Sequence, residues 1–362
     1  MVGALVSPDP TDQRYARIWL NCVEEIVFVD DDFCNDEPGT DDLFPHLSKV
    51  QSLQAAYMVC LYQTWEGTTQ SKSRIRRHRF GTLIAVVRDI GIENARHPSY
   101  SNTDLQDFAW KDFVTREELV RVFLWVFLLD TAFVIFNNHP PRMMIKEMGM
   151  DLASNEAIFQ AITAESCLKL LQKADLGCER MLLRSATEQL RQEQTEPLMK
   201  TAMADLGPLN LFIITSALHS LLFQYQNSFG SPDQLVPIRR ALENWKTMWK
   251  DYIELYSSTA NHMPIGTSQA TPENMWQRIG FVQHASEYWL LASLVLDRLC
   301  ASKEQVSNHN GVVQDAISQK SEPHPDLGQP MLQKYDETSM RQVNELIATF
   351  QRTSISQQEE PP

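Results

Sequence analysis

Glycine is scarce in this sequence, with only 13 in 362 residues, and no two glycines are separated by a single residue. That spacing excludes the Gly-x-Gly-x-x-Gly loop of dinucleotide-binding folds, and the phosphate-binding Gly-x-x-x-x-Gly-Lys loop is also missing. Neither the Gly-x-Ser-x-Gly elbow of hydrolases nor the His-Glu-x-x-His pair of zinc proteases occurs. The sequence therefore identifies no catalytic, cofactor-binding or metal-binding residue.

Cysteine pairs of the kind that hold zinc are missing as well. No two cysteines have Cys-x-x-Cys spacing, and none lies near a histidine pair at the spacing of a zinc finger. Wide, irregular spacing in a long chain is typical of buried free thiols in a reducing compartment, so we expect no bound zinc and no other cofactor. The six cysteines are Cys22, Cys34, Cys60, Cys167, Cys178 and Cys300.

Basic residues are fewer than acidic ones: there are 32 Lys and Arg and 46 Asp and Glu, which gives a formal net charge of −14. Proteins that bind duplex DNA neutralise its phosphates with a basic face, and the overall composition offers none. One basic stretch, KSRIRRHR at 72–79, could contact nucleic acid or direct nuclear import. The other interpretation, which the acidity of the whole chain favours, is the solvated start of an amphipathic helix.

Hydrophobic runs long enough to cross a membrane are also missing. The longest, Val122 to Leu129, is broken by Asp130 and falls short of the ~20 residues that a span needs. The N-terminus has no basic region followed by an apolar core, so no secretory signal is predicted. We therefore expect an intracellular protein without a membrane partner.

Helical periodicity dominates what is present. Apolar residues recur in steps of three and four from Val50 to Trp65, with capping-box spacing between Ser48 and Gln51 and Gly67 after the end. A second helix is predicted from about Ser73 to Ile90. Further helices are predicted over about 155–172, 178–192, 208–226, 234–257, 275–300 and 331–350. No stretch shows a convincing strand alternation, so the predicted class is all-α, a large single helical bundle of about nine or more helices.

A third helix is the most apolar. Thr115 and Glu118 are predicted to open it, and the HPP sequence at 139–141 ends it. Because it is apolar nearly all round, we expect it at the centre of the bundle, with Trp125 fully buried.

The domain organisation follows from these patterns. We expect an N-terminal extension over 1–12 and a helical domain over 13–300. Residues 301–330 are polar and end in prolines, which predicts a linker or long loop. A C-terminal helix over 331–350 is expected to pack back on the domain, and 351–362 is expected to be a disordered tail.

The acidic stretch DDDFCND at 30–36 allows three interpretations. Such aspartates could hold Mg²⁺ against a diphosphate, as in class I terpene synthases. However, Pro38 and Gly39 favour a loop, and no second Asn-Asp-x-x-Ser-x-x-x-Glu metal motif follows. A solvated acidic loop is therefore favoured. The third interpretation is an acidic segment interleaved with aromatic and aliphatic residues, as in some activation segments.

Two histidines and two tryptophans on apolar helices are candidate site residues. His219 and His284 lack the second histidine or carboxylate that metal or acid–base chemistry needs, apart from Glu287 near His284. We expect both histidines in a core or an interface. Trp245 and Trp249 could form the floor of a ligand pocket, but a spacing of four on an amphipathic helix favours ordinary core.

Residues 115–143, TREELVRVFLWVFLLDTAFVIFNNHPPRM, resemble the signature of the fungal-specific transcription factor domain, the helical regulatory region of fungal zinc-cluster and zinc-finger regulators. The resemblance extends over about 11–350, through the segments at 51–92, 209–226, 276–292 and 334–347. One departure is that Ala153 and Phe159 stand where the family has a Leu-Pro step and a Trp. The other is that no zinc-binding module precedes residue 1. The signature positions are Glu118, Arg121, Trp125, Asp130, Pro140 and Pro141.

The resemblance implies a regulatory domain that modulates RNA polymerase II transcription in the nucleus. The implied partners are transcription-machinery proteins or a dimer partner, together with a small-molecule effector. DNA would be bound only indirectly, or through the zinc module that this chain lacks. Two alternatives stay open: a helical-cavity enzyme such as a terpene-cyclase-like lyase, and a stand-alone protein that titrates full-length regulators. Either the chain is a natural stand-alone domain, or its true start lies upstream.

Overall fold

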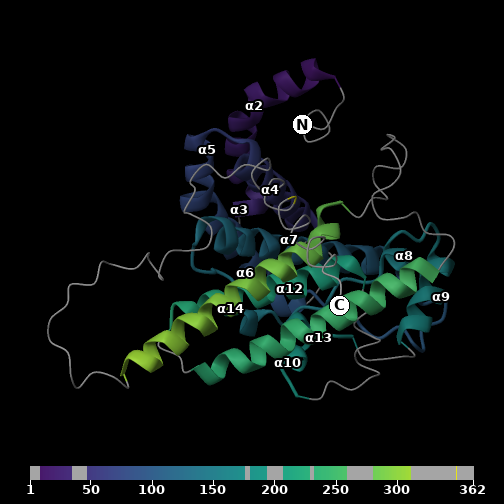
Figure 1. Cartoon of the computed structure of the whole chain (residues 1–362). Coiled ribbons are helices and arrows are strands. Elements are labelled where there is room, and N and C mark those ends of the chain that lie inside the picture. The colour runs from purple at the N-terminus through teal and green to yellow at the C-terminus, as the bar shows by residue number, and fades with distance from the viewer. Residues whose placement is uncertain are drawn as a thin grey trace. The chain divides into compact units, whose positions relative to one another are not determined.

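The protein is helical throughout the residues that the computed structural model describes, which are 9–34, 47–175, 180–193, 207–228, 232–258, 280–310 and 348 (Figure 1). These residues form no sheet, and one isolated bridge joins Asp151 to Leu182. The predicted all-α class is confirmed. The α-helices are α2 (Pro10–Phe28), α3 (Asp31–Cys34), α4 (Leu47–Glu66), α5 (Thr69–Arg74), α6 (Phe80–Ile90), α7 (Trp110–Asn137), α8 (Glu156–Phe159), α9 (Ala164–Asp175), α10 (Leu183–Leu190), α12 (Pro208–Gln226), α13 (Leu235–Ser258) and α14 (Ala285–Asn310).

The chain divides into two compact units, and the division falls inside α7. Among the described residues, the first unit holds those up to Asp130 and Arg142–Leu182, and the second holds Thr131–Pro141 and those from Leu183 onward. The sequence predicted a single bundle around an apolar helix. A helix whose length is divided between two packed units shows the same apolar pattern, so sequence alone does not separate the two arrangements.

In the first unit, α2 packs against α4. Its start is fixed by Asp9, whose side chain accepts the Thr11 N–H, and by Pro10 in the first turn. Residues 10–12, expected in the N-terminal extension, are therefore helical. The inner face of α2 is formed at a spacing of four by Ala16, Leu20, Glu24 and Phe28.

The second predicted helix, Ser73 to Ile90, is built from three consecutive pieces. α5 passes into a π-helical turn, η2 (Ile75–Arg79), and then into α6. The end at Gly91 is as predicted, because Gly91 has a φ of +92° that a side chain would strain. α4 begins at Leu47, so Ser48 lies inside the helix and not at its cap.

The central helix α7 begins at Trp110, five residues before the predicted start. Thr115 does not cap it, because its hydroxyl donates to the Lys111 carbonyl within the helix. An 18-residue window of α7 is long and apolar enough to cross a membrane, but 78% of that window is buried inside the fold, as in the core helix of a globular unit.

Trp125 is only partly buried, so the prediction of full burial is wrong. It lies on a narrow, partly exposed stripe of α7 together with Glu118 and Arg121, at steps of three and four residues. The residues on either side of it, Leu124 and Val126, have no exposed surface.

The second unit is built around α12, α13 and α14, which pack on one another. α12 is buried on nearly every side, as a central helix should be. α14 continues to Asn310, so the linker expected at 301 begins at least ten residues later than predicted. The other predictions for the C-terminal region concern residues that lie almost wholly outside the described ones: the loop beyond 310, the helix over 331–350 and the tail over 351–362.

The helices predicted over 208–226 and 234–257 match α12 and α13, whereas three other predicted helices differ from expectation. Residues 155–172 form two helices, α8 and α9, separated by a turn around Gln160, and the described part of 178–192 holds the eight-residue α10. The segment 275–300 starts, within the described residues, with a 3-10 turn, η7 (Gly280–His284), that leads into α14.

Candidate functional site

A buried polar network surrounds Glu117 in the first unit. Its carboxylate lies 2.9 Å from His97 Nε2, and neither side chain has any exposed surface. The other carboxylate oxygen accepts the Ser154 N–H at 2.9 Å and the Arg121 Nε–H at 2.8 Å. Asp151 accepts the His97 backbone N–H at 2.9 Å. These contacts join three chain segments around one charged group.

The electrostatics of the network keep Glu117 ionised. Burial by itself raises the pKa of this carboxyl, but the hydrogen bond from His97 and the charge of Arg121 outweigh it and lower the pKa to about 2. Because an ionised carboxylate only accepts hydrogen bonds, His97 Nε2 carries the proton that it shares with Glu117.

Arg121 holds the loop after α7 against the helix. Its guanidinium donates to Glu117, to a Glu156 oxygen at 2.9 Å and to the Ser154 carbonyl at 2.9 Å. It also lies 3.8 Å from the centre of the Phe159 ring, in cation–π contact. Phe159 occupies the place where the family was expected to have a tryptophan, so an aromatic face for Arg121 is retained there.

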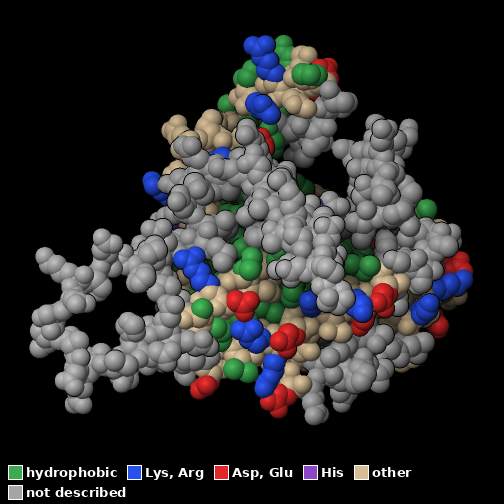
Figure 2. Space-filling view, viewed as in Figure 1, with side chains coloured by type: hydrophobic (Ala, Val, Ile, Leu, Met, Phe, Trp, Pro, Cys, Tyr) green, Lys and Arg blue, Asp and Glu red, His purple; other side chains and the backbone are tan. Residues whose placement is uncertain are grey.

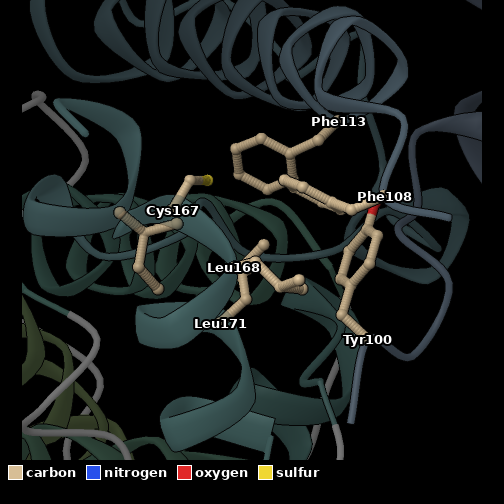
Figure 3. Close-up of a cluster of buried hydrophobic side chains, with 7 residues drawn as sticks. Tyr100, Phe108, Phe113, Cys167, Leu168 and Leu171 are labelled. Carbon is tan, nitrogen blue, oxygen red and sulfur yellow. The ribbon is translucent and has the colours of Figure 1, made fainter. Parts of the chain in front are cut away.

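An apolar cluster lies beside the network (Figure 3). The His97 and Phe113 ring centres are 5.0 Å apart, and Tyr100 approaches Phe113 edge to face. Burial raises the pKa of the Cys167 thiol to about 11, so this cysteine is a packing residue and not a nucleophile. The cluster consists of Tyr100, Phe108, Phe113, Ile158, Cys167, Leu168 and Leu171.

Asp130 fixes the turn that follows α7. Its carboxylate accepts the backbone N–H groups of Arg142 and Met143, each at 2.8 Å. Burial raises the pKa of Asp130 to about 6, although these two hydrogen bonds act in the opposite direction. Pro140 is exposed and Pro141 is partly buried in the turn. The signature residues Arg121 and Asp130 are therefore anchors that hold connecting segments to α7.

The basic stretch at 72–79 is mostly committed to internal contacts. Arg74 and Arg79 each reach the buried Glu24, with Nε–Oε1 distances of 2.6 Å and 3.0 Å. Lys72 and Arg76 are buried, and the Arg76 carbonyl accepts a hydrogen bond from Arg142. The stretch is helical, as that interpretation requires, but it follows the helix start at Thr69 and is not solvated as expected, because only Arg77 and His78 in it are exposed.

Part of the acidic stretch is helix and not loop, which corrects that prediction for Asp31–Cys34. Asp30 starts this short helix by accepting the Phe33 N–H at 3.1 Å, and it also accepts the Ser52 hydroxyl at 2.8 Å. Phe33 is 1% exposed and meets Phe28 edge to face. Its burial explains the helix. Asp36 lies outside the described residues.

The second unit brings His219 to the core, as predicted. Burial lowers the pKa of His219 to about 4, and its Nε2 lies 2.9 Å from the Tyr288 carbonyl. His284 is partly exposed and lies 3.6 Å from Glu287. Trp245 and Trp249 stack at 5.4 Å with both rings buried, so they are core and not a pocket floor.

Among the described residues, no three His, Cys, Asp or Glu side chains gather in a group that could hold a metal ion. Of the cysteines in these segments, Cys60 and Cys167 are buried, Cys300 is partly buried, and Cys22 and Cys34 are exposed. The expectation of buried thiols therefore fails for the last two. Cys178 lies outside the described segments.

Comparison with known proteins assigns this helical chain to a class of proteins, the regulatory domains of transcription factors. The sequence model of the fungal-specific transcription factor domain matches residues 1–247. Transcription factor verF of Penicillium polonicum is 45% identical over 98% of this chain and 48% of its own length. No solved structure matches the chain.

The chain belongs to the fungal-specific transcription factor domain family. The family consists of transcription factors and not enzymes, so the terpene-cyclase-like alternative is not retained. The chain spans about half the length of the curated relative that it matches.

Sequence reasoning missed the centre of the buried network. Glu117 precedes Arg121 by four residues, which is the spacing of a helical ion pair, and this signal could have identified it. His97 and Asp151 have no comparable signal, because His97 reaches Glu117, and Asp151 reaches the His97 backbone, only through the folded chain.

Proposed function

We propose that this chain is the regulatory domain of a fungal transcription factor that acts in the nucleus on RNA polymerase II genes. It would do so by binding a protein partner or a small-molecule effector. The observation that carries the proposal is the similarity to transcription factor verF, because it extends over 98% of the chain and hence over both units.

The charges support an indirect relation to DNA. The net charge is −14, and in the one basic stretch Arg74 and Arg79 form ion pairs with Glu24. Few cations are left there to displace counterions from phosphates, so binding to duplex DNA should be weak and its salt dependence shallow. In this proposal the DNA-reading element, with its zinc, is supplied outside this chain.

Two measurements test the proposal. In the first, a gel-shift series across salt concentrations is expected to show no sequence-specific complex of the isolated chain. In the second, the chain is fused to a foreign DNA-binding domain in a fungal host and is expected to change transcription of a tethered reporter. The foreign domain alone is the baseline. A fusion carrying Lys169→Ala, at a side chain that is 72% exposed, is the matched surface control and should behave like the unchanged fusion.

The outcomes separate the alternatives. Tight, sequence-selective binding by the isolated chain would refute the indirect relation to DNA. A silent reporter together with a cytoplasmic fluorescent fusion would refute the nuclear regulatory role. Inhibition of a full-length regulator by the co-expressed chain, with a silent reporter, would favour the stand-alone titrator instead.

A further inference from the structure

The helix α2 carries a second apolar face in addition to the one packed against α4. Tyr15, Ile18, Trp19, Ile26 and Val29 are each between 60% and 66% exposed. In Figure 2 hydrophobic side chains stand at the surface of this helix beside Lys or Arg side chains, at the top of the view where Figure 1 labels α2. Contiguous exposed apolar residues of this kind mark an interaction surface.

The two faces lie on opposite sides of the helix. At about 100° per residue, the positions of Tyr15, Ile18 and Ile26 fall within about 40° of Cys22, which is itself exposed, and Val29 is the cap residue directly after the helix. The inner positions, which include Leu20 and Phe28, are centred on the opposite side. Within the described part of the chain, contact with α4 therefore leaves the outer face uncovered.

The outer face is symmetric in sequence about Cys22. Ile18 and Ile26 lie four residues before and after it, and Tyr15 and Val29 lie seven residues before and after it. Two copies of such a helix, packed antiparallel, place each apolar residue at the level of another. This self-complementarity is what a two-fold interface between identical chains requires.

The charges of α2 favour the same arrangement. Its basic residues, Arg14 and Arg17, are both in the N-terminal half, where Asp12 is the one acidic residue. The exposed acidic residues Asp31 and Asp32 lie just beyond the C-terminal end, whereas Glu25 is paired with Arg79 and Asp30 accepts the Ser52 hydroxyl. A parallel pair would put the two acidic ends together, whereas an antiparallel pair puts them beside the arginines. Such exposed charges set orientation more than affinity.

We propose that α2 is a homodimerisation surface, through which two copies of the chain associate as antiparallel helices with Cys22 at the two-fold axis. One helix from each copy buries an area at the low end for protein interfaces, below ~1,200 Å². The dimer is therefore weak and depends on concentration, with a dissociation constant on the order of micromolar.

The first test measures association of the purified full chain by sedimentation velocity over a range of concentrations. We expect the weight-average mass to rise from monomer to dimer. Ile18→Glu places a charge in the interface and should raise the dissociation constant at least about tenfold. The matched control is Ile162→Glu, at an isoleucine that is 89% exposed and lies outside α2; this variant should associate like the unchanged chain.

The second test concerns orientation. Ile18→Lys and Ile26→Glu should each weaken the dimer, and the two changes in one chain should restore it. In the antiparallel pair the introduced lysine of one copy lies beside the introduced glutamate of the other. A parallel pair would place like charges together, so the double variant would associate no better than either single one.

The third test uses Cys22 as a reporter of the axis. A short bis-maleimide should link the two copies through this thiol, and Cys22→Ser should abolish the link while the dimer persists in sedimentation. Cys34→Ser, at the other exposed cysteine of this region, should leave the link intact.

A chain that stays monomeric at every concentration, or equal loss with the Ile18 and Ile162 variants, would overturn the proposal and leave the outer face for a different protein. These readouts are masses and cross-links, so their failure would leave the proposed transcriptional role untouched.

Discussion

His97 and Glu117 lie twenty residues apart in sequence, yet their side chains share a contact of 2.9 Å from which solvent is completely excluded. His97 comes from the segment after α6, and Glu117 comes from the second turn of α7. A buried charge is tolerated only where partners replace its water, and Glu117 has three of them in His97, Arg121 and the Ser154 N–H. Stability of the first unit should therefore depend on this carboxylate.

Replacement of Glu117 tests that dependence. Glu117→Gln removes the charge opposite Arg121 and should cost about 3–5 kcal/mol of unfolding free energy at neutral pH, measured by urea denaturation. The control is Glu156→Gln, which changes the other carboxylate on Arg121, a side chain that is 44% exposed; this variant should cost less than about 1 kcal/mol. Equal costs for the two variants would contradict a special role for the buried site.

The contribution of Glu117 to the free energy of unfolding should change with pH in a definite direction. The pKa of Glu117 is lowered in the fold to about 2, so its contribution is fully present above the unfolded value of 4.5. The contribution is lost as pH falls toward 2. The difference in stability between the unchanged chain and Glu117→Gln should therefore be constant from pH 7 to 5 and narrow below pH ~4.5.

The contribution of Asp130 to the free energy of unfolding should change with pH in the opposite direction. Its pKa is raised to about 6, so the stability contributed by its protonated form is present below the unfolded value of 3.8 and is lost as pH rises through 6. Asp130→Asn keeps an oxygen acceptor for the Arg142 and Met143 N–H groups. The unchanged chain should lose about 2–3 kcal/mol relative to this variant between pH 4 and 7.

The control for that comparison is Asp112→Asn, at an acidic residue of α7 whose side chain stays 23% exposed beside Arg116. Thermal unfolding of each variant at several pH values provides the measurement. If Asp112→Asn and Asp130→Asn gave the same pH profile, burial would not be the cause of the raised pKa of Asp130.

The two tryptophans singled out by the sequence should differ in their effect on stability. Trp245 is 1% exposed, donates from Nε1 to the Leu211 carbonyl at 2.8 Å and stacks on Trp249. Trp245→Ala should therefore cost about 3–5 kcal/mol through the cavity it leaves. Trp125 is only partly buried, so Trp125→Ala should cost less, about 1–2 kcal/mol. Denaturant unfolding of both variants decides the order, and a larger loss for Trp125 would be inconsistent with the packing of α7.

Metal content provides an independent check on the chain. The wide cysteine spacing predicts that the purified protein contains no stoichiometric zinc, and elemental analysis measures this directly. One zinc per chain that resists chelation would show a site that the sequence patterns do not reveal.

A structural feature could be predicted from the sequence where residues close to it in the chain decide it, and could not where distant segments decide it. The end of α6 was predictable because Gly91 alone supplies the positive φ, and α12 was predictable because its apolar pattern is continuous. The burial of Trp125 was not, because it depends on which side of α7 the neighbouring segments cover. The same holds for the site: the Glu117–Arg121 pair has a four-residue signature, whereas His97 reaches it only after the chain has folded.

The π-helical turn between α5 and α6 contains one residue more than a regular α-helical turn would. Its Phe80 N–H bonds to the Ile75 carbonyl, five residues back, so residues five apart stand on one side, and Arg74 and Arg79 both reach Glu24. In an ordinary helix, loss of a residue rotates everything before it by about 100°. Here, loss of the exposed His78 would turn the segment into plain α-helix and leave the two arginines four apart, still on one side. Deletion of His78 should therefore keep the charge pairing, and we expect the shortened chain to melt within about 5 °C of the parent in a thermal scan.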